Sequence, residues 1–210
     1  MTLTLMGFFL LFTVGQLLTG AAEYNNEQRL HREPEVSVRD YLRKGHPWEA
    51  LFENWESEFL QMGVFVMFST VLYQRGSPES RRFGVTEPYD VDPRRFQDEP
   101  DAPWPVRKGG VVLWLYERSL GGAFVLLFLL SFIGHALGGW RLTVEEAIEH
   151  GAAQPTFADY VRSSGFWFGS FQNWQSEFLA IAAMVWLSVY LRHRGSPESK
   201  PVHAGHHDYD

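Results

Sequence analysis

The stretch that decides the fold is LGGAFVLLFLLSFIGHALGGW, residues 120–140. It contains no Asp, Glu, Lys or Arg, and only Ser131 interrupts the apolar run from Phe124 to Ile133. A helix of about 20 residues rises about 30 Å, which matches the hydrocarbon thickness of a bilayer. The sequence therefore predicts a transmembrane helix at this place.

Three further apolar blocks predict four spans in all. The first, at about residues 2–22, carries no charged residue, and the other two lie at about residues 56–74 and 175–192. The mean hydropathy of −0.19 hides these blocks because the loops between them are rich in charged residues and proline. We expect an all-α membrane protein with four transmembrane helices and short interfacial amphipathic helices in its loops.

The first block has a competing interpretation as a secretory signal peptide. An apolar run that ends in Ala21 and Ala22 before Glu23 is also typical of a signal peptide. Two observations argue against this interpretation. No positively charged residue precedes the apolar run, and the block has a counterpart deeper in the chain.

The chain matches itself without gaps when it is shifted by 119 positions. Residues 40–80 then fall on residues 159–199, and 20 of these 41 pairs are identical. The same shift places the first apolar block on the third. The longest matching stretches are NWxSEFL at residues 54–60 and 173–179, and RGSPES at residues 75–80 and 194–199.

These matches predict two tandem parallel helix–loop–helix repeats. Repeat unit 1 covers residues 1–80, a Pro-rich polar linker covers residues 81–110, and repeat unit 2 covers residues 111–200. Because each unit holds two spans, both units enter the membrane in the same direction. Lys and Arg lie closest to the spans on the side of the linker, which predicts two cytoplasmic termini. We expect the His-rich tail, residues 201–210, to be disordered.

The composition excludes several classes of function. The chain has no cysteine, which excludes disulfides, thiolate metal sites and iron–sulfur clusters. Its net charge is −7 and it contains no run of Lys and Arg, which argues against binding to nucleic acid. No cofactor is predicted.

Several polar residues recur at the outer ends of the second and fourth spans. A carboxylate suits the first turn of a helix and a serine can cap it, so we expect Glu58 and Glu177 to anchor helices that Ser57 and Ser176 cap. Ionisable groups at membrane depth are also candidates for function. The recurring anchor positions are Asn54, Trp55, Ser57, Glu58, Asn173, Trp174, Ser176 and Glu177.

A polar position inside the first and third spans also recurs, where Gln16 falls on His135. Such groups usually form hydrogen bonds between helices. A proton relay through His135 is the functional alternative, but Gln16 cannot titrate, which argues that this position does not require titration. In the same span, Gly134 and Gly138 have the four-residue spacing that allows two helices to approach closely.

Two Glu–His pairs form the candidate metal set. Glu27 and His31 fall on Glu146 and His150, and a spacing of four places each pair on one helix face. If the two helices meet, these four side chains suit Zn, Mn or Fe. The alternative, which we favour, is a hydrogen bond within each pair on a solvated helix.

The loops carry signals for short helices. A capping box at Thr143 and Glu146 predicts a short helix that stops at Gly151. Two further short helices are expected near Tyr41 and Tyr160.

The doubled NWxSEFL and RGSPES motifs resemble a bacterial family of multi-pass membrane proteins known only as a domain of unknown function. The resemblance extends over nearly the whole chain. It implies a multi-pass protein of the bacterial inner (plasma) membrane, and it implies no activity and no catalytic residue.

Our leading functional hypothesis is a non-enzymatic accessory protein that acts through interaction, because the recurring polar residues lie at the span ends. Its expected partners are the lipid bilayer and a membrane-protein partner or a second copy of the chain. The alternatives are a small transporter or channel, and a protein with an outward-facing metal site.

Overall fold

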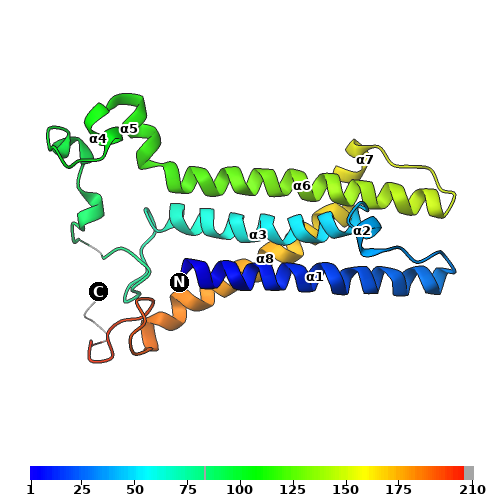
Figure 1. The fold of residues 1–210 in the computed structure, drawn as a ribbon. Helices are drawn as coiled ribbons and strands as arrows, with labels where there is room; N and C mark the ends of the chain where they lie inside the picture. Colours follow the sequence, from blue (N-terminus) through cyan, green and yellow to red (C-terminus); the bar gives the residue numbers. More distant parts are fainter. Residues whose placement is uncertain (83, 206–210) are drawn as a thin grey trace. The chain divides into compact units, whose positions relative to one another are not determined.

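The computed structural model describes residues 1–82 and 84–205 (Figure 1). Within these residues the chain is helical and has no strand, so the prediction of an all-α protein is confirmed. Along the chain the helices are α1 (Thr2–His31), α2 (Val38–Tyr41), α3 (His46–Phe68), η1 (Pro88–Asp90), η2 (Pro93–Phe96), α4 (Trp104–Lys108), α5 (Gly110–Glu117), α6 (Ser119–Glu149), α7 (Phe157–Val161) and α8 (Ser164–Tyr190).

Contacts divide the chain into two compact units. Unit 1 combines Met1–Glu56 with Leu130–Phe171, and unit 2 combines Ser57–Leu129 with Gln172–Asp210. Each unit therefore takes segments from both halves of the sequence.

Two helices, α1 and α6, are long and apolar enough to cross a membrane. Their apolar windows are only 6% and 17% buried. Large exposed apolar surfaces mark contact with lipid or with another protein. The length and composition of these two helices therefore support an association with membranes.

The helices that contain the NWxSEFL motifs begin earlier than predicted. We expected Ser57 and Ser176 to cap the first turns, but α3 begins at His46 and α8 begins at Ser164. Both serines therefore lie inside helices, and the Ser176 hydroxyl donates to the carbonyl of Asn173. The predicted caps are wrong because no residue between the true starts and the motifs interrupts helical geometry.

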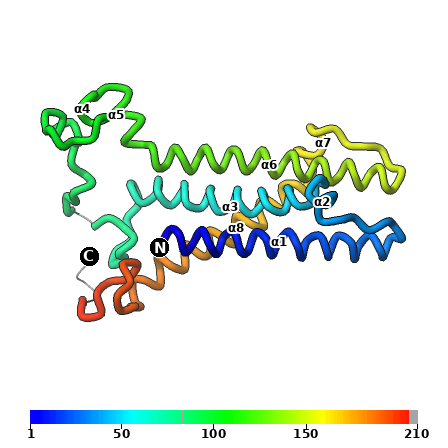
Figure 2. Tube along the Cα trace, viewed as in Figure 1, coloured from blue at the N-terminus to red at the C-terminus, as the bar shows by residue number. Residues whose placement is uncertain are grey.

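Helix α6 runs without a break through the predicted capping box, as Figure 2 shows. The hydroxyl of Thr143 donates to the carbonyl of Gly139, 2.9 Å away within the same helix. Thr143 therefore lies inside a continuous helix and does not begin a new one, so that part of the prediction is wrong. The predicted stop is confirmed, because the helix ends at Glu149 and Gly151 has a φ of 63°.

The two short loop helices are confirmed. Helix α2 ends at Tyr41, and helix α7 contains Tyr160. Ser37 and Thr156 are the N-caps, and each accepts a hydrogen bond from the backbone N–H three residues later.

The linker contains more helix than we expected. Residues 81–110 were predicted to be an irregular connector, and they hold η1, η2 and α4, with prolines in the first turns of all three. Proline suits a first turn because it lacks the N–H that is unpaired there. The predicted disorder of residues 201–210 partly lies outside the described residues.

Within unit 1, α3 and α6 approach closely at the predicted glycine pair. A Cβ added to Gly134 would lie 2.6 Å from the ring of Phe52, and one added to Gly138 would lie 2.6 Å from the backbone nitrogen of Glu49. Only glycine allows the two backbones to come this close. The contact brings the first part of α3 against the middle of α6.

Candidate functional site

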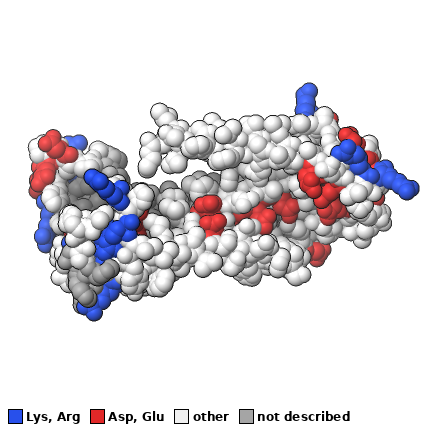
Figure 3. Space-filling view, turned by 90° about the horizontal axis from the view of Figure 1, so that it is seen from below, with Lys and Arg blue, Asp and Glu red and all other residues white. Residues whose placement is uncertain are grey.

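The part of α3 in unit 1 carries three carboxylates on one face. Glu49, Glu53 and Glu56 are separated by four and three residues, which places them one above another on a helix. Figure 3 shows acidic side chains, in red, among mostly uncharged atoms on the face that it draws. The glycine contact described above turns this face of α3 toward α6.

The deepest of the three carboxylates is paired with a histidine. Glu56 is fully buried, His135 is 2% exposed, and Glu56 Oε2 lies 3.0 Å from His135 Nδ1. When Glu56 is an ionised carboxylate it can only accept, and Nδ1 is then the donor. His135 lies midway along α6, in the predicted span.

Aromatic rings close the space around this pair. The ring of Phe166 lies 4.9 Å from the imidazole, centroid to centroid, and packs in turn against Phe132 and Tyr160. Burial of this kind removes water, so the attraction between Glu56 and a protonated His135 is much stronger than it is at a surface. An isolated buried charge is costly, and a paired one is tolerated.

A pocket of about 520 Å³ lies next to the pair. His135 lines it, together with Glu49, Glu53 and Glu146. The hydroxyl of Tyr160 donates to Glu49 Oε1 at 3.2 Å. Burial raises the pKa of Glu49, which precedes the predicted span, and the hydrogen bond from Tyr160 partly opposes this. Burial and the nearby charge of Glu49 raise the pKa of the Tyr160 hydroxyl.

The four predicted metal ligands line a second pocket in unit 1, of about 340 Å³. The rings of His31 and His150 meet edge to face at 6.0 Å, and His150 Nδ1 donates to the backbone carbonyl of Glu146 at 2.8 Å. The structure therefore brings Glu27, His31, Glu146 and His150 together. However, among the described residues no group of three or more His, Asp or Glu side chains is arranged to hold a metal ion.

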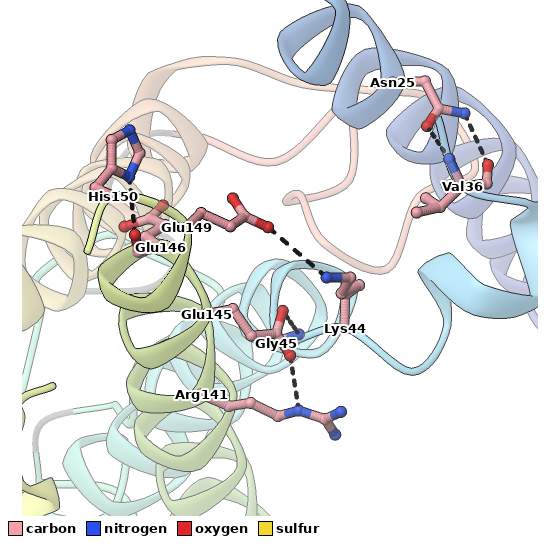
Figure 4. Close-up of polar contacts among 9 residues, drawn as sticks. All are labelled: Asn25, Val36, Lys44, Gly45, Arg141, Glu145, Glu146, Glu149 and His150. Atoms are coloured by element: carbon pink, nitrogen blue, oxygen red, sulfur yellow. Dashed lines mark hydrogen bonds and ion pairs between the residues drawn. The ribbon is translucent and has the colours of Figure 1, made fainter. Parts of the chain in front are cut away.

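Two cations pair with acidic residues that line this second pocket, as Figure 4 shows. Lys44 pairs with Glu149 at 3.8 Å, and Arg141 pairs with Glu145 at 3.0 Å. Glu145 also accepts a hydrogen bond from the backbone N–H of Gly45. The contacts of Lys44 and Gly45 tie α6 to the residues just before α3, whereas the Arg141 pair lies within α6. Much of the acidic charge here therefore has a structural role. The metal site stays a prediction.

The remaining candidate residues do not take part in the hydrogen bond between Glu56 and His135. Gln16 is exposed, and Asn54 donates to the carbonyl of Ala50. Glu58 is exposed, and in unit 2 the backbone carbonyl of Glu177 accepts a hydrogen bond from Gln61 at 2.9 Å.

Aromatic contacts hold the two tryptophans of the motifs. The ring of Trp55 lies 5.5 Å from that of Phe52, and the ring of Trp174 lies 6.1 Å from that of Phe128. Asn173 and Ser176 share the hydrogen bond described above. Sequence reasoning missed Glu49, Glu53, Glu56 and Tyr160, although the spacing of the three carboxylates was visible.

Unit 2 brings the two RGSPES loops together. Gly76 and Gly195 turn the chain with φ values of 78° and 84°. The carboxyl groups of Glu79 and Glu198 share a hydrogen bond, which requires a proton on one of them. Burial, this hydrogen bond and the charge of Glu198 raise the pKa of Glu79 to about 7.

Comparison with known proteins gives one match. A family model described as a domain of unknown function (DUF6766) matches residues 1–210. Neither the curated proteins nor the solved structures contain a match. The function must therefore be argued from the site.

Proposed function

Because the chain belongs to this family of unknown function, we propose from its own geometry that it is a small proton-coupled membrane transporter. The proposal includes four transmembrane helices in two tandem copies of one helix–loop–helix unit. The observation that carries it is the buried Glu56–His135 pair.

Local contacts that recur at a spacing of 119 residues support the tandem architecture. Trp48 Nε1 donates to the carbonyl of Leu42 at 2.9 Å, and Trp167 Nε1 donates to that of Val161 at 3.0 Å. The Ser37 and Thr156 caps described above also correspond. In this architecture α1, α2 and α3 correspond to α6, α7 and α8, and α3 and α8 supply the two spans that are less apolar.

A buried carboxylate–imidazole pair suits proton transfer. Histidine titrates near neutral pH, and ionisable residues inside a membrane protein mark ion or proton pathways. His135 contacts Glu56 on one side and lines the acidic pocket on the other, so it links a buried carboxylate to an accessible space. An interaction protein has no need of such a pair, whose burial is costly.

The sequence itself offers a control for this pair. The 119-residue shift places His135 on Gln16 and Glu56 on Gln175. Each of the two ionisable residues therefore corresponds to an amide in the other copy. The double variant Glu56→Gln, His135→Gln introduces the same two amides and removes titration from the pair.

Proton uptake into proteoliposomes tests the proposal. A potassium gradient with valinomycin provides a membrane potential, and an enclosed pH-sensitive dye reports proton entry. We expect uptake with the wild type and its loss in the double amide variant. Glu58→Gln is the matched control because it removes one exposed carboxylate from the same helix. Absence of uptake in the wild type, or full uptake in the double variant, would refute the proposal.

An accessory protein is the second candidate, because the apolar window of α1 is only 6% buried. Lipid or a partner helix would cover that surface. Purification from native membranes in mild detergent, followed by mass spectrometry of the intact assembly, separates the two: a stoichiometric partner supports the accessory role. A location in the bacterial inner membrane with both termini cytoplasmic belongs to the same proposal.

A further inference from the structure

The pocket beside His135 carries negative charge without a lining cation. It is formed by α3, α6, α7 and α8 within unit 1, and Glu49, Glu53, Glu146 and Asp159 line it. Among the described residues, neither Lys nor Arg lines it. In the neighbouring pocket, two of the lining carboxylates, Glu149 and Glu145, are paired with Lys44 and Arg141. The carboxylate of Asp159 already accepts hydrogen bonds from Thr156, the N-cap residue of α7.

The polar groups of this pocket are almost all hydrogen-bond acceptors. Ionised carboxylates only accept. The hydroxyl protons of Tyr160 and Thr143 are already donated, to Glu49 and to the carbonyl of Gly139. The hydroxyl of Ser163, which accepts from the backbone N–H of Phe166, is the remaining hydroxyl donor among the described lining residues. A ligand that forms hydrogen bonds with these carboxylates must carry N–H or O–H donors, and a positive charge would balance their negative charge.

The imidazole of His135 is a second and independent pointer to a ligand. Its side chain is 98% buried, since 2% is exposed, and it lines the pocket. Nδ1 is used by Glu56, and no described residue forms a hydrogen bond with Nε2. When the ring is neutral, Nε2 is one more acceptor next to the carboxylates.

Apolar groups provide the rest of the wall. Phe166, Leu142 and Pro155 line the pocket, and the backbone comes close at Gly169, where an added Cβ would lie 2.6 Å from Glu53 Oε1. The volume of about 520 Å³ lies within the range of small-molecule sites. The pocket therefore suits a ligand with an apolar part and one charged end.

We propose that this pocket binds a small organic cation with N–H donors, a primary ammonium ion carrying an apolar or aromatic body. The inference rests on the proposed function, for which it names the substrate class. A cation in the pocket and a charged imidazole of His135 would repel each other, because His135 lines the same space. Ammonium ion and proton therefore compete, which is the condition for exchanging one for the other.

Equilibrium binding of benzylammonium to the full chain in detergent tests the proposal by titration calorimetry. Benzyl alcohol is the neutral control ligand of similar shape. We expect benzylammonium to bind and benzyl alcohol to bind at least tenfold more weakly. Glu49→Gln and Glu53→Gln should each weaken binding about tenfold or more, because each removes a charged hydrogen-bond acceptor. Glu58→Gln should leave binding unchanged.

The comparison of the two ligands on the wild type needs no variant, so it holds even if one variant fails to fold. Equal binding of both ligands, or no binding of benzylammonium, would overturn the inference. So would unchanged affinity in folded Glu49→Gln and Glu53→Gln. Proton uptake without benzylammonium binding removes only this inference, and binding without proton uptake removes only the proposed proton coupling.

Discussion

Replacement of His135 by Leu tests whether the buried pair stabilises the fold. Leucine fills a similar volume but removes the imidazole that faces the fully buried carboxylate of Glu56 at 3.0 Å. A hydrogen bond to a charged group contributes about 1.5–3 kcal/mol. Removing one member of a buried ion pair costs about 3–5 kcal/mol. We therefore expect a loss of about 2 kcal/mol with a neutral imidazole and about 3–5 kcal/mol with a protonated one.

A second substitution separates the loss of the pair from a general packing defect. When Glu56→Leu is added to His135→Leu, the remaining carboxylate is removed from its buried position. Replacing both members of a buried pair by apolar residues is often neutral or stabilising. The double variant should therefore regain most of the stability that the single variant loses.

Unfolding by SDS in mixed micelles, followed by circular dichroism, measures these free energies. The interaction energy from the double-mutant cycle should be at least about 1 kcal/mol, which exceeds the usual deviation for independent sites. Additive losses in the two single variants would show that the two side chains do not act as a pair. A loss below about 0.5 kcal/mol in His135→Leu would refute the buried contact itself.

Three further substitutions test other parts of the structure. Gly138→Ala should lower the free energy of unfolding in SDS by about 1–3 kcal/mol, because the added Cβ would meet backbone atoms of α3. Gly15→Ala is the control and should be tolerated, because its Cβ meets no described atom within 4 Å. The contact of Glu79 with Glu198 favours the protonated carboxyl of Glu79, whose pKa is raised to about 7. The contribution of this contact to stability is therefore present below the ordinary carboxyl pKa and is lost as the pH rises through about 7. Glu79→Gln should flatten this pH dependence in melting temperatures measured from about pH 4 to 8. The hydroxyl of Ser170 is fully buried and has no hydrogen-bond partner among the described residues, so Ser170→Ala should leave the melting temperature unchanged or raise it.

Local sequence signals predicted the all-α fold and the short helices well. The short helices expected near Tyr41 and Tyr160 are present, with Ser37 and Thr156 as their caps, and Gly151 follows the end of α6 with a positive φ. Such features depend on a few neighbouring residues. The starts of α3 and α8 were misplaced because hydropathy marks where an apolar span begins, and a helix extends beyond that point.

The buried site was harder to predict because it depends on contacts distant in sequence. Glu56 and His135 are 79 residues apart, and the close approach at Gly134 and Gly138 helps to bring their helices together. Glu56 is a variable position of the NWxSEFL motif, since Gln175 is its counterpart. An emphasis on recurring residues therefore directed attention to Glu58, which is exposed.

The difference between the two copies is itself an argument for function. Gln16 corresponds to His135 in the 119-residue shift, and this position considered alone argues against a role that requires titration. Considered with its partner, the pattern changes, because Glu56 and His135 are both ionisable whereas Gln16 and Gln175 are both amides. If the pair were only structural, a matching pair of amides would satisfy the same helices without a buried charge. The ionisable pair, to which each copy contributes one residue, then requires a reason beyond folding, and proton transfer is the reason that its chemistry supplies.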